Sequence, residues 1–157
     1  MPRQSEDEFY MEEALKEAAE AYRLGEVPIG AVVVRNGTVV GRGHNMREKW
    51  QDPTAHAEVI AIRDACSQVG GWRLTESTLY VTIEPCPMCA GAMVLARLPR
   101  LVYGAQDFKG GAVDSLFDLV RNTKLNHRLE VTAGILEEEC RAIMQKFFQE
   151  LRGASNK

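Results

Sequence analysis

Apolar residues recur along the first part of the chain at two different spacings. Over residues 9–24 they return every three or four positions and stop at Gly25, which predicts an amphipathic helix. Two β-branched runs follow at 29–34 and 38–43, and the Asn36-Gly37 pair between them is a strong hairpin-turn signal. We therefore expect an opening helix followed by two antiparallel strands.

The rest of the chain alternates between helical and extended patterns. Asp52 and Pro53 are suited to begin a helix that continues to about Val69, which would place His56 and Glu58 in its first turn. Further patterns predict strands at 78–83, 101–103 and 130–132, and helices at 86–95, at 115–120 and from about residue 136. Strand, helix and strand over 78–103 indicate a parallel crossover. The predicted fold is an α/β domain of three layers, with a mixed five-stranded sheet between helices.

Length and composition agree with one compact domain over residues 1–157, with a disordered tail at 153–157. Apolar residues make up 45% and charged residues 26%, as in an ordinary globular protein. No apolar run approaches the roughly 18 to 20 residues that a membrane-spanning helix needs, and the polar start is unlike a signal peptide. We expect a cytoplasmic protein with no membrane partner.

The formal net charge of −3 is spread unevenly. Residues 6–20 hold seven acidic side chains and one basic one, which predicts a solvated helix face. Residues 97–128 hold six basic and three acidic side chains, and such a stretch can contact phosphates. Scattered charges are weak evidence alone. The basic residues are Arg97, Arg100, Lys109, Arg121, Lys124 and Arg128.

The four cysteines fall into two kinds. Cys66 and Cys140 lie among apolar neighbours in predicted helices, where a free cysteine acts as a small buried hydrophobe. Cys86 and Cys89 form a Cys-x-x-Cys motif at a predicted helix start, where the helix dipole and free N–H groups stabilise thiolates. Residues three apart share a helix face, so both sulfurs can reach one metal ion. A dithiol redox pair fits the same motif.

His56 and Glu58 at the start of a second helix favour a metal site over a dithiol redox pair, because a redox pair needs neither residue. His56, Cys86 and Cys89 make three ligands of the kinds that zinc prefers, and the open fourth position is typical of a catalytic site. His44 and His127 are paired with no other ligand at motif spacing. Residues two apart on a regular helix diverge by about 200°, so His56 and Glu58 require an irregular first turn.

Zinc lowers the pKa of a coordinated water from 15.7 to about 7, which provides a nucleophile at neutral pH. Glu58 is the carboxylate nearest to the proposed metal in sequence, and a carboxylate there can act as the general acid and base.

The His-Ala-Glu motif at 56–58 and the Pro-Cys-Pro-Met-Cys motif at 85–89 resemble those of the cytidine deaminase-like superfamily. Nearly the whole chain is similar to the bacterial tRNA-specific adenosine deaminases. The segments that carry this resemblance are 27–31, 44–45, 52–58, 85–92, 107–112 and 126–128.

The resemblance implies a cytidine deaminase-like fold, one Zn²⁺ per subunit and a homodimer. It implies conversion of adenosine to inosine at the wobble position of a tRNA anticodon stem-loop, with Glu58 as the catalytic residue. It also implies that Asn45 hydrogen-bonds the base, that Ile29 makes an apolar contact with it, and that the loop with Asp107 and Lys109 grips the neighbouring sugar and phosphates. Ala57 is the remaining expected substrate contact.

Other functions stay open at this point. The zinc motif alone is also compatible with deamination of free guanine, cytosine or nucleosides, which activity without RNA would reveal. From another class, the chain could be a noncatalytic zinc-containing RNA-binding subunit, although a structural metal site has no need of Glu58. A thiol redox protein would show a reversible disulfide between Cys86 and Cys89 and no bound metal.

Overall fold

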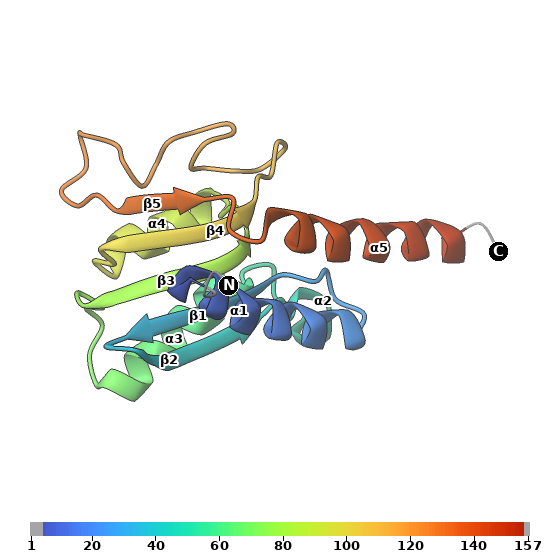
Figure 1. Ribbon diagram of the computed structural model, residues 1–157, viewed down its shortest axis with the longest axis horizontal. Helices are drawn as coiled ribbons and strands as arrows, with labels where there is room; N and C mark the ends of the chain where they lie inside the picture. The colour runs from blue at the N-terminus through green and yellow to red at the C-terminus, as the bar shows by residue number, and fades with distance from the viewer. Residues whose placement is uncertain (1–4, 156–157) are drawn as a thin grey trace.

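A five-stranded mixed sheet forms the centre of the computed structural model, which describes residues 5–155 (Figure 1). The strand order is β2-β1-β3-β4-β5; β1 runs antiparallel to β2 and β3, whereas β3, β4 and β5 run parallel. This confirms the predicted mixed sheet and the parallel crossover. The strands are β1 (Gly30–Arg35), β2 (Thr38–His44), β3 (Ser77–Ile83), β4 (Arg100–Ala105) and β5 (Glu130–Ala133).

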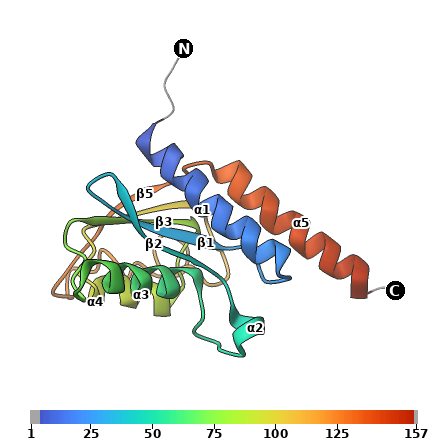
Figure 2. The ribbon, with the colours of Figure 1, turned by 90° about the horizontal axis from the view of Figure 1, so that it is seen from below.

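Helices cover both faces of the sheet, which confirms the three-layer prediction (Figure 2). On one face lie α1 (Glu6–Arg23) and α5 (Glu137–Ser155), and on the other lie α3 (Ala57–Val69) and α4 (Pro87–Leu95). A single-turn helix, α2 (Arg47–Trp50), was not predicted; it lies between β2 and α3. None of the helices within residues 5–155 combines the length and apolar character needed to cross a bilayer.

The hairpin between β1 and β2 follows from the sequence. Asn36 and Gly37 have φ values of 51° and 75°, the left-handed conformation that a two-residue hairpin turn requires. Strand β1 is apolar without alternation because both of its faces are buried. Val32 packs in the cluster beneath α1, and Val33 packs in the cluster beneath α3 and α4.

Three sequence predictions were wrong in detail. Residues 115–120 form no helix, because the N–H group of Leu119 donates to the carbonyl oxygen of Ala112, seven residues earlier, instead of to the carbonyl group one turn earlier. Helix α3 begins at Ala57, because Asp52 caps a turn by accepting from the N–H of Thr54. The predicted tail is helical through Ser155, and residues 156–157 lie outside the described residues.

Helix α3 lies unusually close to β2, and Gly43 allows this approach. A Cβ atom on Gly43 would lie 2.4 Å from the carbonyl oxygen of Ala57 and 2.6 Å from the nitrogen of Ala61. Both atoms belong to the helix backbone and cannot rotate away. The contact therefore fixes the first turn of α3, and with it the position of His56 and Glu58.

We predict that Gly43→Ala lowers the free energy of unfolding by about 1–3 kcal/mol, because the methyl group forces α3 away from the sheet. Urea denaturation at fixed zinc concentration measures this. Gly71→Ala is the matched control, since Gly71 is exposed, has ordinary backbone angles and has no atom within 4 Å of an added Cβ. An unchanged unfolding midpoint for Gly43→Ala would contradict the close-packing argument.

Candidate active site

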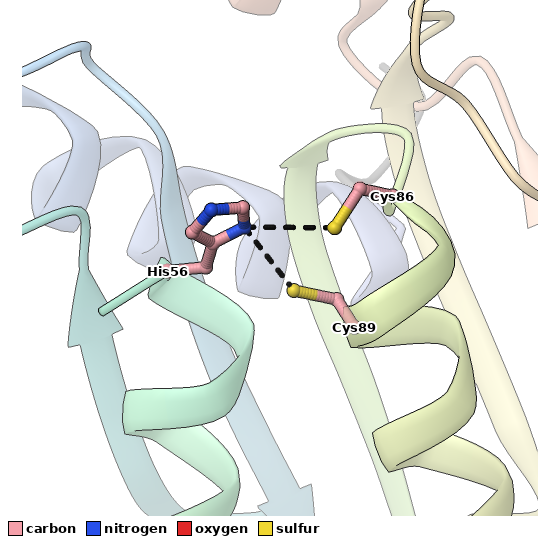
Figure 3. A group of neighbouring side chains, drawn as sticks. All are labelled: His56, Cys86 and Cys89. Atoms are coloured by element: carbon pink, nitrogen blue, oxygen red, sulfur yellow. Dashed lines mark hydrogen bonds between the residues drawn. The ribbon is translucent and has the colours of Figure 1, made fainter. Parts of the chain in front are cut away.

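His56, Cys86 and Cys89 come together where the N-terminal ends of α3 and α4 lie side by side (Figure 3). The Nδ1 atom of His56 is 3.6 Å from the Sγ of Cys86 and 3.5 Å from the Sγ of Cys89. All three possible ligand atoms lie within 4.8 Å of one another. Cys89 is buried, while His56 and Cys86 are half-buried. The structure thus assembles the predicted ligands.

Both helix starts have the same local geometry. His56 is the N-cap of α3 and Cys86 is the N-cap of α4, each with extended backbone angles. The extended conformation of His56 turns its side chain out of the helical register, whereas Glu58 belongs to the first helical turn. The predicted irregularity between His56 and Glu58 is therefore the helix boundary itself.

The three donors fit a zinc ion in spacing and chemistry. Tetrahedral zinc with Zn–N near 2.0–2.1 Å and Zn–S near 2.3 Å places nitrogen and sulfur ligands about 3.6 Å apart. The two N···S distances, 3.5 and 3.6 Å, match this value. Three protein ligands of this type leave one position open, as in catalytic rather than structural zinc sites.

The polar groups perturb one another strongly. The hydrogen bond with Cys89, supported by His56, lowers the pKa of Cys86 to about 4 even though burial opposes this. The same hydrogen bond, together with burial, raises the pKa of Cys89. Cys86 is thus a ready thiolate ligand. Burial raises the pKa of Glu58 to about 7, because the residue is only 4% exposed and its carboxyl group is almost fully removed from water.

A cavity of about 1130 Å³ opens above the cluster. This is slightly larger than typical pockets for small ligands, so it has room for more than a single base. Except for Cys89, every residue predicted for the site lines this cavity. These residues are Ile29, Asn45, His56, Ala57, Glu58, Cys86, Asp107 and Lys109.

Asn45 is held in a defined orientation on the cavity wall. Its Nδ2 donates to the carbonyl oxygen of Val27 at 3.3 Å, and its Oδ1 accepts from the N–H of Arg47 at 3.1 Å. An amide can make four hydrogen bonds, so one N–H and one lone pair remain beyond these two. The side chain therefore keeps a donor and an acceptor for a ligand.

Glu26 supports the segment that follows Asn45, and sequence reasoning missed it. Glu26 is only 1% exposed, and its carboxylate accepts hydrogen bonds from the N–H groups of Glu48, at 3.0 Å, and Lys49, at 2.7 Å. These bonds give partners to the free N–H groups at the start of α2. Because the acceptor is charged, they are stronger than neutral hydrogen bonds and stabilise this short helix. Only its position beside Val27 in the sequence could have hinted at this role.

Asp107 and Lys109 lie on the opposite wall, in the loop that follows β4. Oδ1 of Asp107 accepts from the N–H groups of Lys109 and Gly110, each at 3.1 Å, so this side chain closes a tight turn. The loop is fastened to buried Glu84, whose carboxylate accepts five hydrogen bonds. Although burial acts in the other direction, the bonds from Ser115 and the backbone hold the pKa of Glu84 below its usual value.

Helix α5 forms a third wall that the sequence analysis did not predict. Its amphipathic pattern indicated a helix but not which cavity it would border. The residues of α5 that line the cavity are Arg141, Met144, Gln145, Phe148, Gln149 and Arg152.

The remaining candidates are engaged elsewhere. His44 contacts Glu17 at 2.8 Å and His127 contacts the carbonyl oxygen of Leu98 at 2.6 Å, so neither histidine joins the group of His56, Cys86 and Cys89. Of the predicted basic stretch, Arg100 pairs with Asp7 and Arg121 pairs with Asp114. That stretch is therefore not one continuous phosphate-binding surface, and Lys109 is its member in the cavity.

Comparisons with known proteins agree with this geometry. The model of the MafB19-like deaminase family matches residues 5–152. A protein of Bacillus subtilis (strain 168) named tRNA-specific adenosine deaminase is 53% identical over 148 residues, which cover 94% of this chain and 92% of the relative. The chain belongs to the tRNA-specific adenosine deaminase family.

Solved structures place it within the wider deaminase group. A structure from work on A-to-I editing by tRNA:A34 deaminases at the wobble position is 47% identical, with a TM-score of 0.83, and the match covers 86% of this chain and 98% of that one. A guanine deaminase from Bacillus subtilis is 30% identical with a TM-score of 0.62, over 98% of both chains. The tRNA deaminase is thus the more similar of the two in sequence and in structure.

Metal content tests the ligand set. We predict that wild-type protein binds one zinc ion per chain and that Cys86→Ala loses it, because two ligands cannot hold the ion at a catalytic site. Elemental analysis after dialysis measures the ratio. Cys66→Ala is the control, since Cys66 is half-buried and contacts the carbonyl oxygen of Trp72. Full zinc occupancy in Cys86→Ala would refute the assignment.

Proposed function

We infer that this protein catalyses the hydrolytic deamination of adenosine to inosine at the wobble position of a tRNA anticodon loop. The observation that carries this inference is the meeting of His56, Cys86 and Cys89 beside a buried Glu58 at a cavity. The named activities of its relatives supply the substrate. His56, Cys86 and Cys89 hold the ion, and bound Zn²⁺ supplies the Lewis acidity that makes a water molecule nucleophilic near neutral pH.

Glu58 moves the protons of the reaction. It accepts one proton from the attacking water as the C6–O bond forms and delivers it to the ring nitrogen; it then accepts the remaining proton, from the new C6 hydroxyl group, and delivers it to the leaving exocyclic amine. The C6–N bond then breaks, ammonia departs and inosine remains. Burial suits Glu58 to this role, because a carboxyl group shielded from bulk water exchanges its proton with the substrate.

Recognition of the base falls to the wall that carries Ile29, Asn45 and Ala57. The remaining donor and acceptor of Asn45 match the edge of adenine, which offers both kinds of partner. Ile29 supplies an apolar contact for the face of the ring, and Ala57, which has no long side chain, leaves room for the base.

Recognition of the RNA backbone falls to the loop that carries Asp107 and Lys109. An ammonium group can contact a phosphate, and a carboxylate can accept a hydrogen bond from a ribose hydroxyl. A base in a hairpin loop is unpaired and costs less to extract than a paired one, so an anticodon stem-loop suits this cavity.

The whole chain, residues 1–157, acts as one deaminase domain in this proposal, and two copies form a homodimer. Exposed apolar side chains such as Leu95, Leu116 and Phe117, at 70%, 52% and 57%, are available to such an interface. A tRNA substrate implies a cytoplasmic location.

Deamination of a free base is the second candidate. It is favoured by the likeness to a guanine deaminase that is 30% identical over 98% of both chains. Such a small substrate would fill only part of the cavity of about 1130 Å³.

The decisive assay is incubation of zinc-loaded protein with an unmodified anticodon stem-loop that carries a wobble adenosine, followed by mass analysis of its nucleosides. We expect inosine at that position and no turnover of free adenine, guanine, cytosine or cytidine. Turnover of a free base without inosine in the RNA would support the second candidate. Stem-loop binding without any turnover would identify a noncatalytic RNA-binding subunit.

In the same assay, Glu58→Gln should keep one zinc ion per chain but lose at least about 10²-fold in kcat, because the amide cannot carry the protons. The variant preserves side-chain size, so metal content serves as the internal control. An active, zinc-loaded Glu58→Gln protein would remove Glu58 from the mechanism.

A further inference from the structure

Glu84 follows β3 directly and precedes Cys86 by two residues, yet the chemistry above assigns it no step. Its side chain is almost completely buried, with 3% exposed, and all of its hydrogen bonds reach the loop of residues 106–115. Oε1 accepts from the N–H of Asp107 at 3.0 Å and from the hydroxyl of Ser115. Oε2 accepts from the N–H groups of Val113, Asp114 and Ser115 at 3.0, 2.8 and 3.0 Å.

The loop is also held by the bonds of Tyr103 and Arg121 to Asp114 and by the burial of Ala112 and Val113 in the core. Residues 106–115 form no helix or strand, so their N–H groups need partners outside regular secondary structure. Two backbone hydrogen bonds hold the same segments together: Glu84 N–H donates to Ala105 at 2.8 Å, and Ala112 N–H donates to Pro85 at 2.8 Å. The loop is therefore docked on the Glu84-Pro85 segment, which leads directly into Cys86.

The loop is also shaped to receive the carboxylate. A Cβ atom on Gly111 would lie 2.3–2.5 Å from the carboxylate atoms of Glu84. Any larger residue at this position would push the carboxylate out of its ring of donors. Gly111 and Glu84 are thus complementary, and the loop closes around the acid.

We propose that Glu84 is a positioning residue, whose carboxylate holds the 106–115 loop so that Asp107 and Lys109 face the RNA beside the metal cluster. This role rests on the proposed function. It links two parts of the site: the segment that leads into α4 carries a zinc ligand, and the loop docked on it carries the RNA contacts. Loss of the link should weaken RNA binding without altering the reacting groups.

The test is Glu84→Gln, which keeps the side chain's size but replaces one acceptor oxygen with an amide that faces N–H donors. We expect zinc content to stay at one ion per chain. Amide hydrogen exchange should accelerate about tenfold or more either at residue 107 or at residues 113–115, since the N–H groups that face the new NH2 group lose their acceptor. KM for the stem-loop should rise about tenfold or more, with kcat within about threefold of wild type.

Asp64→Asn is the matched control. The Asp64 carboxylate also accepts a backbone N–H, that of Arg42 at 3.0 Å, but it does not line the cavity. It should change neither loop exchange nor KM. Ser115→Ala removes one donor to Glu84 and tests the same link, with smaller effects in the same direction, if Glu84→Gln fails to fold.

Unchanged loop exchange and unchanged KM in Glu84→Gln would overturn the proposal, and so would a loss of kcat at constant KM. Wild-type activity on the stem-loop separates this failure from a failure of the proposed function. If wild-type protein forms no inosine, both the function and the RNA-positioning role fail, while exchange rates still report whether Glu84 anchors the loop.

Discussion

The spacing between two helix N-termini is the constraint on which the site depends. His56 and Cys86 occupy the N-cap positions of α3 and α4, and Cys89 lies one turn into α4. These side chains can share a metal ion only if the two helices are held in fixed positions on the same face of the sheet. Gly43 allows α3 to approach β2 closely, and the crossover between the parallel strands β3 and β4 places α4 beside it. The close packing at Gly43 and the crossover thus determine the geometry of the ligands.

Buried carboxylates complete the site on both sides. The carboxylate of Glu26 accepts hydrogen bonds from N–H groups of α2, which follows Asn45. The carboxylate of Glu84 accepts hydrogen bonds from N–H groups of the loop that carries Asp107 and Lys109. Both segments are too short or too irregular to provide carbonyl acceptors for their own N–H groups. A buried carboxylate therefore supplies the hydrogen bonds that a helix or sheet would otherwise provide. Loops built in this way can present functional side chains while the acid beneath keeps their shape.

Much of this arrangement could be predicted from local patterns. Apolar spacing and the Asn36-Gly37 turn predicted the sheet and its main helices, and the Cys-x-x-Cys and His-x-Glu motifs predicted the residues that meet at the cluster. The failures involve long-range partners. Residues 115–120 have a helical pattern, but they continue a loop that is fastened to Glu84, about thirty positions earlier, and the N–H group of Leu119 donates to Ala112 seven residues back. The contribution of α5 to the cavity likewise depends on how a distant helix lies across the sheet.

Zinc K-edge X-ray absorption on the zinc-loaded protein tests the central claim most directly, because it counts the atoms around the ion. The account predicts two sulfur neighbours at about 2.3 Å and two nitrogen or oxygen neighbours at about 2.0–2.1 Å, one of them the imidazole of His56. Three or four sulfur neighbours, or a coordination shell unchanged in Cys86→Ala, would contradict an open site built from His56, Cys86 and Cys89.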